Sequence, residues 1–155
     1  LQVMPERIMV STKEKIEEEQ KRISAEIEQR EREAREKAER EAEALRAQYQ
    51  ELMASIIFCE AGNQPYEGQV AVGAVVINRV KSSVYPNSIE AVIYQSRQFS
   101  PASTGWLDRV RSSRSYTATS MQAAADALAG SNPIGECLYF DQGGYGMKIG
   151  AHYFH

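Results

Sequence analysis

Two helical patterns meet in the stretch Phe58-Cys59-Glu60-Ala61-Gly62-Asn63-Gln64-Pro65-Tyr66-Glu67-Gly68-Gln69. The first pattern ends at Glu60, just before Gly62, a natural stop for a helix. The second begins at Pro65, which suits the first turn of a helix, and Glu67 lies near the positive end of that helix. A carboxyl group at a break between two buried helices is well placed for general acid–base chemistry. We therefore predict that Glu60 is a catalytic acid.

The apolar run that follows, residues 70–80, is dominated by β-branched residues and on that ground resembles a strand. Its proline start and its length, which reaches Ser82, favour a central buried helix instead. Gly73 would let a second helix approach closely, at a propensity cost of about 1 kcal/mol relative to alanine. We expect this helix to form the middle of the core.

The N-terminal part of the chain predicts one long helix. Residues 13–52 contain no Gly or Pro and are rich in strong helix formers. Glutamates precede Lys or Arg by four positions, the favourable order, at 17/21, 18/22, 26/30, 28/32, 31/35, 33/37 and 36/40. We expect residues 1–11 to be an irregular lead broken at Met4-Pro5, with Ser11 or Thr12 as the N-cap of the helix.

The apolar seam of this helix is thin. Ile16 and Ile23 are a heptad apart, but alanines dominate the later positions and Arg30 interrupts them. The seam consists of Ile16, Ile23, Ile27, Ala34, Ala38, Ala42, Leu45, Tyr49, Leu52 and Ile56. Two interpretations stay open: a weak coiled coil that self-associates or binds a protein partner, and a solvated spacer held by its own ion pairs.

Charge divides the chain into two parts. Residues 1–51 carry 11 Lys/Arg and 14 Asp/Glu, whereas the rest of the chain carries seven of each. We therefore predict a charged helical segment over residues 1–50 and a near-neutral globular domain over residues 51–155. The balance supplies no basic field for nucleic acid. A neutral polar polymer such as a glycan fits it.

Cysteine usage and hydropathy bear on location. Cys59 and Cys137 are too few for a disulfide scaffold, and both one bridge and two free thiols are compatible with the sequence. No run of about 20 apolar residues predicts a membrane span. The sequence opens without a start methionine, as expected of a mature or trimmed chain from which a signal peptide is missing.

The C-terminal half predicts short elements around a long loop. Ser88 is the expected cap of a helix over residues 89–94, and Thr117 or Thr119 caps another that Gly130 ends. Residues 95–114 predict a long loop with Phe99 and Trp106 exposed, and long loops in compact domains are usually functional. Residues 137–140 and 149–154 predict two short strands of one hairpin. The fold class is therefore α+β and mainly helical, with a small β-hairpin.

Residues 52–155 resemble the SleB-type cell-wall hydrolases, the spore-cortex-lytic enzymes of spore-forming bacteria. The blocks that carry the resemblance, in the order and spacing of that family, are Cys59–Ala61, Pro65–Val72, Val76–Val80, Val92–Gln95, Gln98–Pro101, Ala127–Gly130, Leu138–Phe140 and Ile149–Phe154. The resemblance implies a lysozyme-like fold related to lytic transglycosylases. It also implies cleavage of peptidoglycan glycan strands at the cell wall or spore envelope, with roles in cortex lysis and germination, and maps the catalytic glutamate onto Glu60.

The sequence departs from the family pattern beside this residue. Many members continue Glu-Ala-Arg-Gly-Glu, whereas here Gln64 replaces the second glutamate. The other acids of the domain lie at helix starts, within a helix or near loops, so one acid fits the inventory better than a catalytic pair. No cofactor or metal is expected. A lytic transglycosylase needs only one acid, because the 6-hydroxyl group of the sugar replaces water.

Other residues are assigned by their chemistry to support this acid. The candidates for binding the saccharide are Gln98, Phe99, Ser100, Tyr139 and His152, whose rings, amides and hydroxyls suit sugars. For each of these five residues a packing role competes. Glu67, Gln64 and Asn78 are predicted to hold the site from behind, and a second catalytic acid is the alternative for Glu67.

Three other functions are weighed against the transglycosylase. An N-acetylmuramoyl-L-alanine amidase would need about three zinc ligands, and His152 and His155 are the only histidines. A thiol hydrolase would use Cys59 with His152, but no charge near Cys59 in the sequence would activate it. A non-catalytic peptidoglycan-binding module on a coiled-coil arm is the third.

Overall fold

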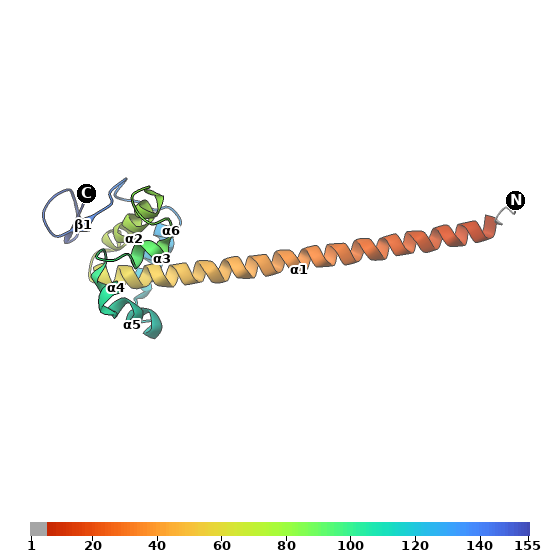
Figure 1. Cartoon of the computed structure of the whole chain (residues 1–155), viewed down its shortest axis with the longest axis horizontal. Coiled ribbons are helices and arrows are strands. Elements are labelled where there is room, and N and C mark those ends of the chain that lie inside the picture. Colours follow the sequence, from red (N-terminus) through yellow and green to blue (C-terminus); the bar gives the residue numbers. More distant parts are fainter. Residues whose placement is uncertain (1–5) are drawn as a thin grey trace. The chain divides into compact units, whose positions relative to one another are not determined.

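The computed structural model describes the backbone of residues 6–155 and side chains from residue 10. Its elements, in order, are α1 (Glu6–Ala61), α2 (Tyr66–Lys81), α3 (Ile89–Ile93), α4 (Ser100–Thr104), α5 (Trp106–Ser113), α6 (Ala118–Leu128), β1 (Phe140–Asp141), β2 (Met147–Ile149) and β3 (His152–Phe154). Figure 1 shows α1 as one uninterrupted ribbon. The mainly helical α+β prediction is confirmed.

Helix α1 starts earlier than predicted. It begins at Glu6, so the prediction that Ser11 or Thr12 caps it is wrong, and residues 6–11 are helical. The predicted break at Met4-Pro5 lies outside the described residues. The reason for the earlier start is that no Gly or Pro follows Glu6 until the helix ends.

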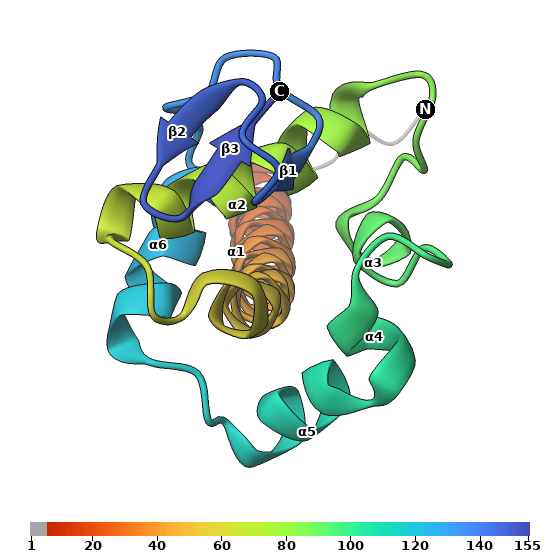
Figure 2. The same cartoon turned by 90° about the vertical axis from the view of Figure 1, so that its left-hand side faces the viewer.

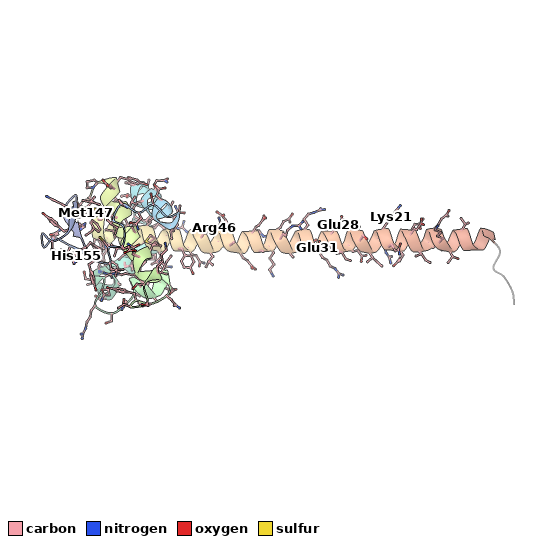
Figure 3. All side chains as sticks on the ribbon, turned by 90° about the horizontal axis from the view of Figure 1, so that it is seen from above. Lys21, Glu28, Glu31, Arg46, Met147 and His155 are labelled. Atoms are coloured by element: carbon pink, nitrogen blue, oxygen red, sulfur yellow. The ribbon has the colours of Figure 1, made fainter. Side chains whose placement is uncertain are left out.

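The chain divides into two compact units, residues 1–44 and 45–155. The side chains of residues 10–48 are exposed, and Lys21, Glu28, Glu31 and Arg46 project from α1 in Figure 3. No helix of the described residues is long and apolar enough to cross a membrane.

The core of the second unit is built where α1, α2 and α6 meet. Residues 52–57 of α1 are buried, as are residues 68–76 of α2, so the apolar run forms the buried helix that was predicted. A Cβ atom on Gly73 would lie 2.7 Å from Cβ of Ala127 and 3.2 Å from Cδ1 of Ile57. Gly73 therefore allows α2 to pack closely against α6.

The predicted caps of the short helices are largely confirmed. Ser88 accepts a hydrogen bond from the Ala91 amide and starts α3, and Thr117 accepts one from the Ser120 amide and starts α6. Gly130 follows the end of α6 with a positive φ of 106°. Each cap satisfies an amide that has no partner within its own helix.

The predicted long loop over residues 95–114 is wrong. It contains α4 and α5, which meet at Gly105, where φ is +82°. The turn formers that suggested a loop serve instead as helix ends, with Pro101 in the first turn of α4. One face of α5 is buried through Leu107 and Val110.

The small sheet has three antiparallel strands in the order β1-β3-β2 rather than the two that were predicted (Figure 2). The segment taken as one strand turns at Gly150 and Ala151, and Ile149 pairs with His152 across that turn. Cys137 to Tyr139 lie before β1, and the Leu138 and Tyr139 amides donate to the His155 carbonyl. The turn is possible because Gly150 has a φ of +61°.

Candidate active site

Glu60 lies in the last turn of α1, where the helix leaves the core. It is half-buried, and burial raises the pKa of its carboxyl group. Among the described residues it has no hydrogen-bond or ion-pair partner. A carboxyl group in this environment holds its proton at a higher pH than an exposed one, as a general acid requires.

The other partly buried acids of the domain differ from Glu60 because their carboxylates are bonded. The Tyr116 hydroxyl donates to Glu51 at 2.5 Å, and Tyr66 and Gln122 donate to Asp126. The exposed carboxylates Asp108 and Asp141 are bonded as well, to Tyr94 and to Gly143 and His155 respectively. Glu67, Glu90 and Glu136 are exposed to solvent. In the described part of the domain, Glu60 alone is a half-buried acid without a bonded partner.

The segment that follows Glu60 is fixed by two amide side chains. The Ala151 backbone N–H donates to Oε1 of Gln64 at 2.8 Å, which ties the helix break to the turn between β2 and β3. Nε2 of Gln69 donates to the Gln64 carbonyl at 3.1 Å, and the Ser120 hydroxyl donates to Oε1 of Gln69 at 2.8 Å. The residue that replaces the family's second glutamate is thus a connector between the helix break and the sheet.

Cys59 precedes the acid and is inert. Burial, with a smaller contribution from the charge of Glu60, raises the pKa of its thiol to about 11. Cys59 and Cys137 are both free thiols, which answers the question that their spacing left open. A thiol with so high a pKa is a poor nucleophile near neutral pH.

Behind the sheet, Asn78 and Arg79 of α2 fix the chain that leads into β1. The amide of Asn78 donates to the carbonyls of Gly135 and Cys137, each at 2.8 Å. Nε of Arg79 donates to the Leu138 carbonyl at 2.8 Å. These bonds position the backbone immediately before Tyr139.

Arg79 is a component of the site that sequence reasoning missed. The residue is 4% exposed. Its guanidinium lies over the rings of Tyr85, Phe99 and Tyr139 and donates to Oε1 of Gln98 at 3.2 Å. It stands four and seven positions after the buried residues Val75 and Val72, so helical spacing would have placed it on the buried face.

The candidate saccharide-binding residues divide by exposure. Gln98 and Ser100 are exposed, and Tyr139 is 47% exposed. Phe99 is 3% exposed and packs on Phe140, so the prediction that it is exposed is wrong. Its apolar ring is buried beneath Arg79, where it offers no free face to a ligand.

His152 is 6% exposed at the start of β3. Its ring meets Phe140 and Phe154 edge-on, and its Nδ1 has no hydrogen-bond partner among the residues that the structure describes. Burial lowers the pKa of the imidazole, which keeps it neutral near pH 7. In the part of the chain that the structure describes, no three metal-ligating side chains gather.

The family model for cell wall hydrolases matches residues 63–154. The chain belongs to the cell wall hydrolase family. Glu60 stands three residues before the range that the model matches.

Curated relatives of this cell wall hydrolase include two spore cortex-lytic enzymes. The enzyme of Oceanobacillus iheyensis is 38% identical over 92 residues, and that of Bacillus subtilis is 36% identical over 89 residues. These alignments cover 58% and 57% of this chain but 31% and 28% of those enzymes. The chain therefore spans about a third of the length of the curated relatives it matches.

Two solved structures resemble the fold. The catalytic domain of Bacillus cereus SleB aligns with a TM-score of 0.61 at 32% identity, over 70% of this chain and 89% of that one. The catalytic domain of the germination-specific lytic transglycosylase SleB from Bacillus anthracis aligns with a TM-score of 0.60 at 31% identity, over 69% and 93%. The cell wall hydrolase thus shares most of the catalytic domain of both proteins.

Proposed function

We propose that the chain cleaves the glycan strand of peptidoglycan as a lytic transglycosylase, with Glu60 as its single catalytic acid. The observation that carries the proposal is the state of Glu60, a half-buried carboxyl group with a raised pKa and no bonded partner among the described residues. The likeness to the germination-specific lytic transglycosylase supports it. The site of action would be the bacterial cell wall or spore envelope.

In this reaction Glu60 donates its proton to the glycosidic oxygen between N-acetylmuramic acid and N-acetylglucosamine. The C1–O bond breaks, and the N-acetylglucosamine side leaves with the proton on its new hydroxyl group. The Glu60 carboxylate then accepts the proton of the muramic acid 6-hydroxyl, whose oxygen bonds to C1. A 1,6-anhydro ring forms, no water is consumed, and Glu60 is protonated again.

Mass spectrometry of digested peptidoglycan tests the proposal. Digestion in heavy-oxygen water should give anhydro-muramyl ends without the label, whereas a hydrolase would give labelled reducing ends. An amidase would release stem peptides from intact glycan. Labelled reducing ends, released stem peptides or an absence of all products would each overturn the assignment.

Two variants test whether Glu60 is the catalytic acid. Glu60→Gln keeps the shape of the side chain and should abolish all products, because the amide cannot donate or accept the proton in turn. Glu67→Gln is the matched control, since Glu67 is exposed and lies in the first turn of α2. Products that persist in Glu60→Gln would show that another group is the acid.

We also propose that the arm, residues 10–44 of α1, self-associates. Val10, Ile16, Ile23 and Ile27 are each about half exposed, at 50%, 53%, 46% and 50%. With Ala42 left out, the seam residues from Ile16 to Tyr49 are spaced alternately by seven and four, an 11-residue repeat that favours straight or slightly right-handed pairing.

The charges beside this seam favour a second copy of the chain over a partner whose surface charges are all of one sign. They form three pairs of opposite sign, each four positions apart: Lys15 and Glu19, Glu26 and Arg30, and Lys37 and Glu41. A parallel copy can therefore meet each of them with the opposite sign. Analytical ultracentrifugation should show dimers that Ile23→Glu dissociates and Val84→Glu, on the domain and 81% exposed, does not. A monomer at every concentration would contradict the proposal.

A further inference from the structure

A cluster of aromatic rings lies on the sheet side of the domain. The rings of Tyr139 and His155 stack at 5.5 Å and 15°, and the ring of Tyr145 meets His155 edge-on at 5.3 Å. Tyr139 is 47% exposed and Tyr145 is 74% exposed. We call these three residues the aromatic shelf; His155 is labelled in Figure 3.

The aromatic shelf borders a surface depression of about 520 Å³. The depression is lined by Glu136, Leu138, Tyr139, Tyr145, Gly146, Phe154 and His155. A second depression, of about 330 Å³, shares Glu136 and Leu138 with it and extends to Asn78, Lys81 and Ser82. Glu60 is not among the residues that line either depression.

The rings of the shelf are held in place before any ligand arrives. Backbone hydrogen bonds in both directions join residue 139 to His155, and Nε2 of His155 lies 3.1 Å from a carboxylate oxygen of Asp141. Arg79 lies over the ring of Tyr139. A ligand would therefore lose little binding energy to ordering of these side chains.

A tight glycine loop presents Tyr145. Gly144 and Gly146 have φ values of 90° and 103°, and a Cβ atom on Gly146 would lie 2.1 Å from the Phe154 carbonyl oxygen. The loop therefore runs directly against β3. Tyr145, between these two glycines, keeps its ring in solvent beside His155 rather than folding it into the core.

The lining of the depression determines the class of ligand. Glu136 carries a formal charge, and the lining residues include no Lys or Arg that would attract a phosphate or another anion. Open aromatic rings suit the apolar C–H face of a pyranose, and tyrosine hydroxyls with a carboxylate suit its hydroxyl and acetamido N–H groups. A volume of several hundred Å³ accommodates one or two sugar rings.

We propose that the aromatic shelf is a second sugar-binding site, which takes an N-acetylated hexosamine of the glycan strand away from the bond that is cleaved. Tyr145 supplies the open ring, and Tyr139 with His155 forms the wall behind it. The choice of glycan as the ligand rests on the proposed function. The site would hold long strands on the enzyme and contribute little to short ones.

Binding in the Glu60→Gln background tests the shelf without turnover. The probe is a peptide-free oligosaccharide of alternating N-acetylglucosamine and N-acetylmuramic acid, titrated by calorimetry and by NMR. Tyr145→Ala should weaken binding about three- to tenfold. Tyr145→Phe should bind as the parent does, because it keeps the ring, and Val84→Ala, 81% exposed outside the depression, should have no effect.

Each result separates this proposal from the proposed function. Equal affinity of Tyr145→Ala and its parent, or no oligosaccharide binding at all, would overturn the shelf even if the wild type forms anhydro products. Binding that a free stem peptide reproduces, with shifts at Tyr145, would overturn sugar as the ligand. If Tyr145→Ala weakens binding and the wild type forms no products, the shelf stands and the catalytic proposal fails.

Turnover supplies a second readout. In the active enzyme Tyr145→Ala should raise KM for long glycan strands several-fold with kcat unchanged, because the lost contact is the same in the ground state and the transition state. Short oligosaccharides should react equally in both proteins. A fall in kcat at unchanged KM would contradict a binding role for Tyr145.

Discussion

The guanidinium of Arg79 donates a hydrogen bond to the Leu138 carbonyl at 2.8 Å, which joins the buried helix α2 to the chain entering the sheet. Within the described residues no carboxylate bonds this cation. Its partners are the carbonyl, Oε1 of Gln98 and three aromatic rings. The cation is thus used to organise backbone and rings rather than to form an ion pair.

Arg79→Met should therefore destabilise the domain by about 2 kcal/mol, because the Leu138 carbonyl loses its charged donor. Urea unfolding measures the change. Arg109→Met is the control, since Arg109 is exposed on α5 and its replacement should change the free energy of unfolding by less than about 0.5 kcal/mol. Equal losses in the two variants would show that the buried bonds contribute nothing specific.

The two glycines of α2 should respond in opposite directions to alanine. Gly73→Ala places a methyl group 2.7 Å from Cβ of Ala127, and overpacking should lower the free energy of unfolding by about 1 to 2 kcal/mol net of helix propensity. Gly68→Ala meets nothing closer than 3.5 Å and should raise it by up to about 1 kcal/mol. Thermal and urea unfolding of both proteins decide the matter, and the same sign for both would refute the packing argument.

The turn between β2 and β3 can be tested with a pair of glycines that share one backbone conformation. Gly150 and Gly135 have φ values of +61° and +62°, so alanine should cost about 1 to 2 kcal/mol of backbone strain at each. At Gly150 the methyl group would also lie 2.5 Å from Oε1 of Gln64 and 2.9 Å from Cδ of Pro65, whereas at Gly135 nothing lies within 4 Å.

Gly150→Ala should therefore be the less stable variant, and it should lose activity because the Gln64 side chain must leave the Ala151 amide. Gly135→Ala should stay active. Urea unfolding and the release of glycan fragments measure the two effects. Similar stability and activity in both proteins would mean that the Gln64 contact does not position the helix break.

The buried state of Glu60 makes stability depend on pH. Burial raises its pKa in the folded protein, so the folded state binds the proton more tightly than the unfolded chain does. The free energy of unfolding should then fall as pH rises from the ordinary carboxyl pKa of about 4.3 through the raised one. Below that window both states are protonated, and the penalty is absent.

Glu60→Gln should consequently be more stable than the wild type at about pH 7. Below about pH 4 the two proteins should be equally stable, because the Glu60 carboxyl group is then protonated in both the folded and the unfolded state. Urea titrations at both pH values measure the difference. Glu67→Gln, which alters an exposed acid, is the control variant. A Glu60→Gln protein that is no more stable near neutral pH would mean that the carboxylate is well solvated.

Much of the fold could be predicted because local chemistry determines it. The spacing of glutamate and arginine predicted the helix of the arm, and the proline at position 65 predicted that α2 is a helix. Ser88 and Thr117 cap helices in both the prediction and the structure. The errors fall where tertiary contacts override local signals. Gly105 and Pro101 read as loop formers but divide and start short helices, and Phe99 is buried by Arg79, which no short-range pattern indicates.

The candidate site was only partly readable from the sequence. Glu60 stands out because an acid before a glycine stop has a local signature. The contacts of Gln64 with Ala151, and of Arg79 with Leu138, join segments 87 and 59 positions apart in the sequence. Such pairs form only when the sheet is packed on α2, so Gln64 could be named without its partner, and Arg79 was missed.

The bond between Gln64 and Ala151 also has a consequence for the time at which the site forms. Contacts between distant positions close late, because the chain between them must first be ordered. During synthesis the bond from Ala151 to Gln64 therefore cannot form until residue 151 has left the ribosome. A nascent chain that has made the long helix and α2 still lacks the finished surroundings of its acid, so a cell making this protein would be exposed to little activity from incomplete chains.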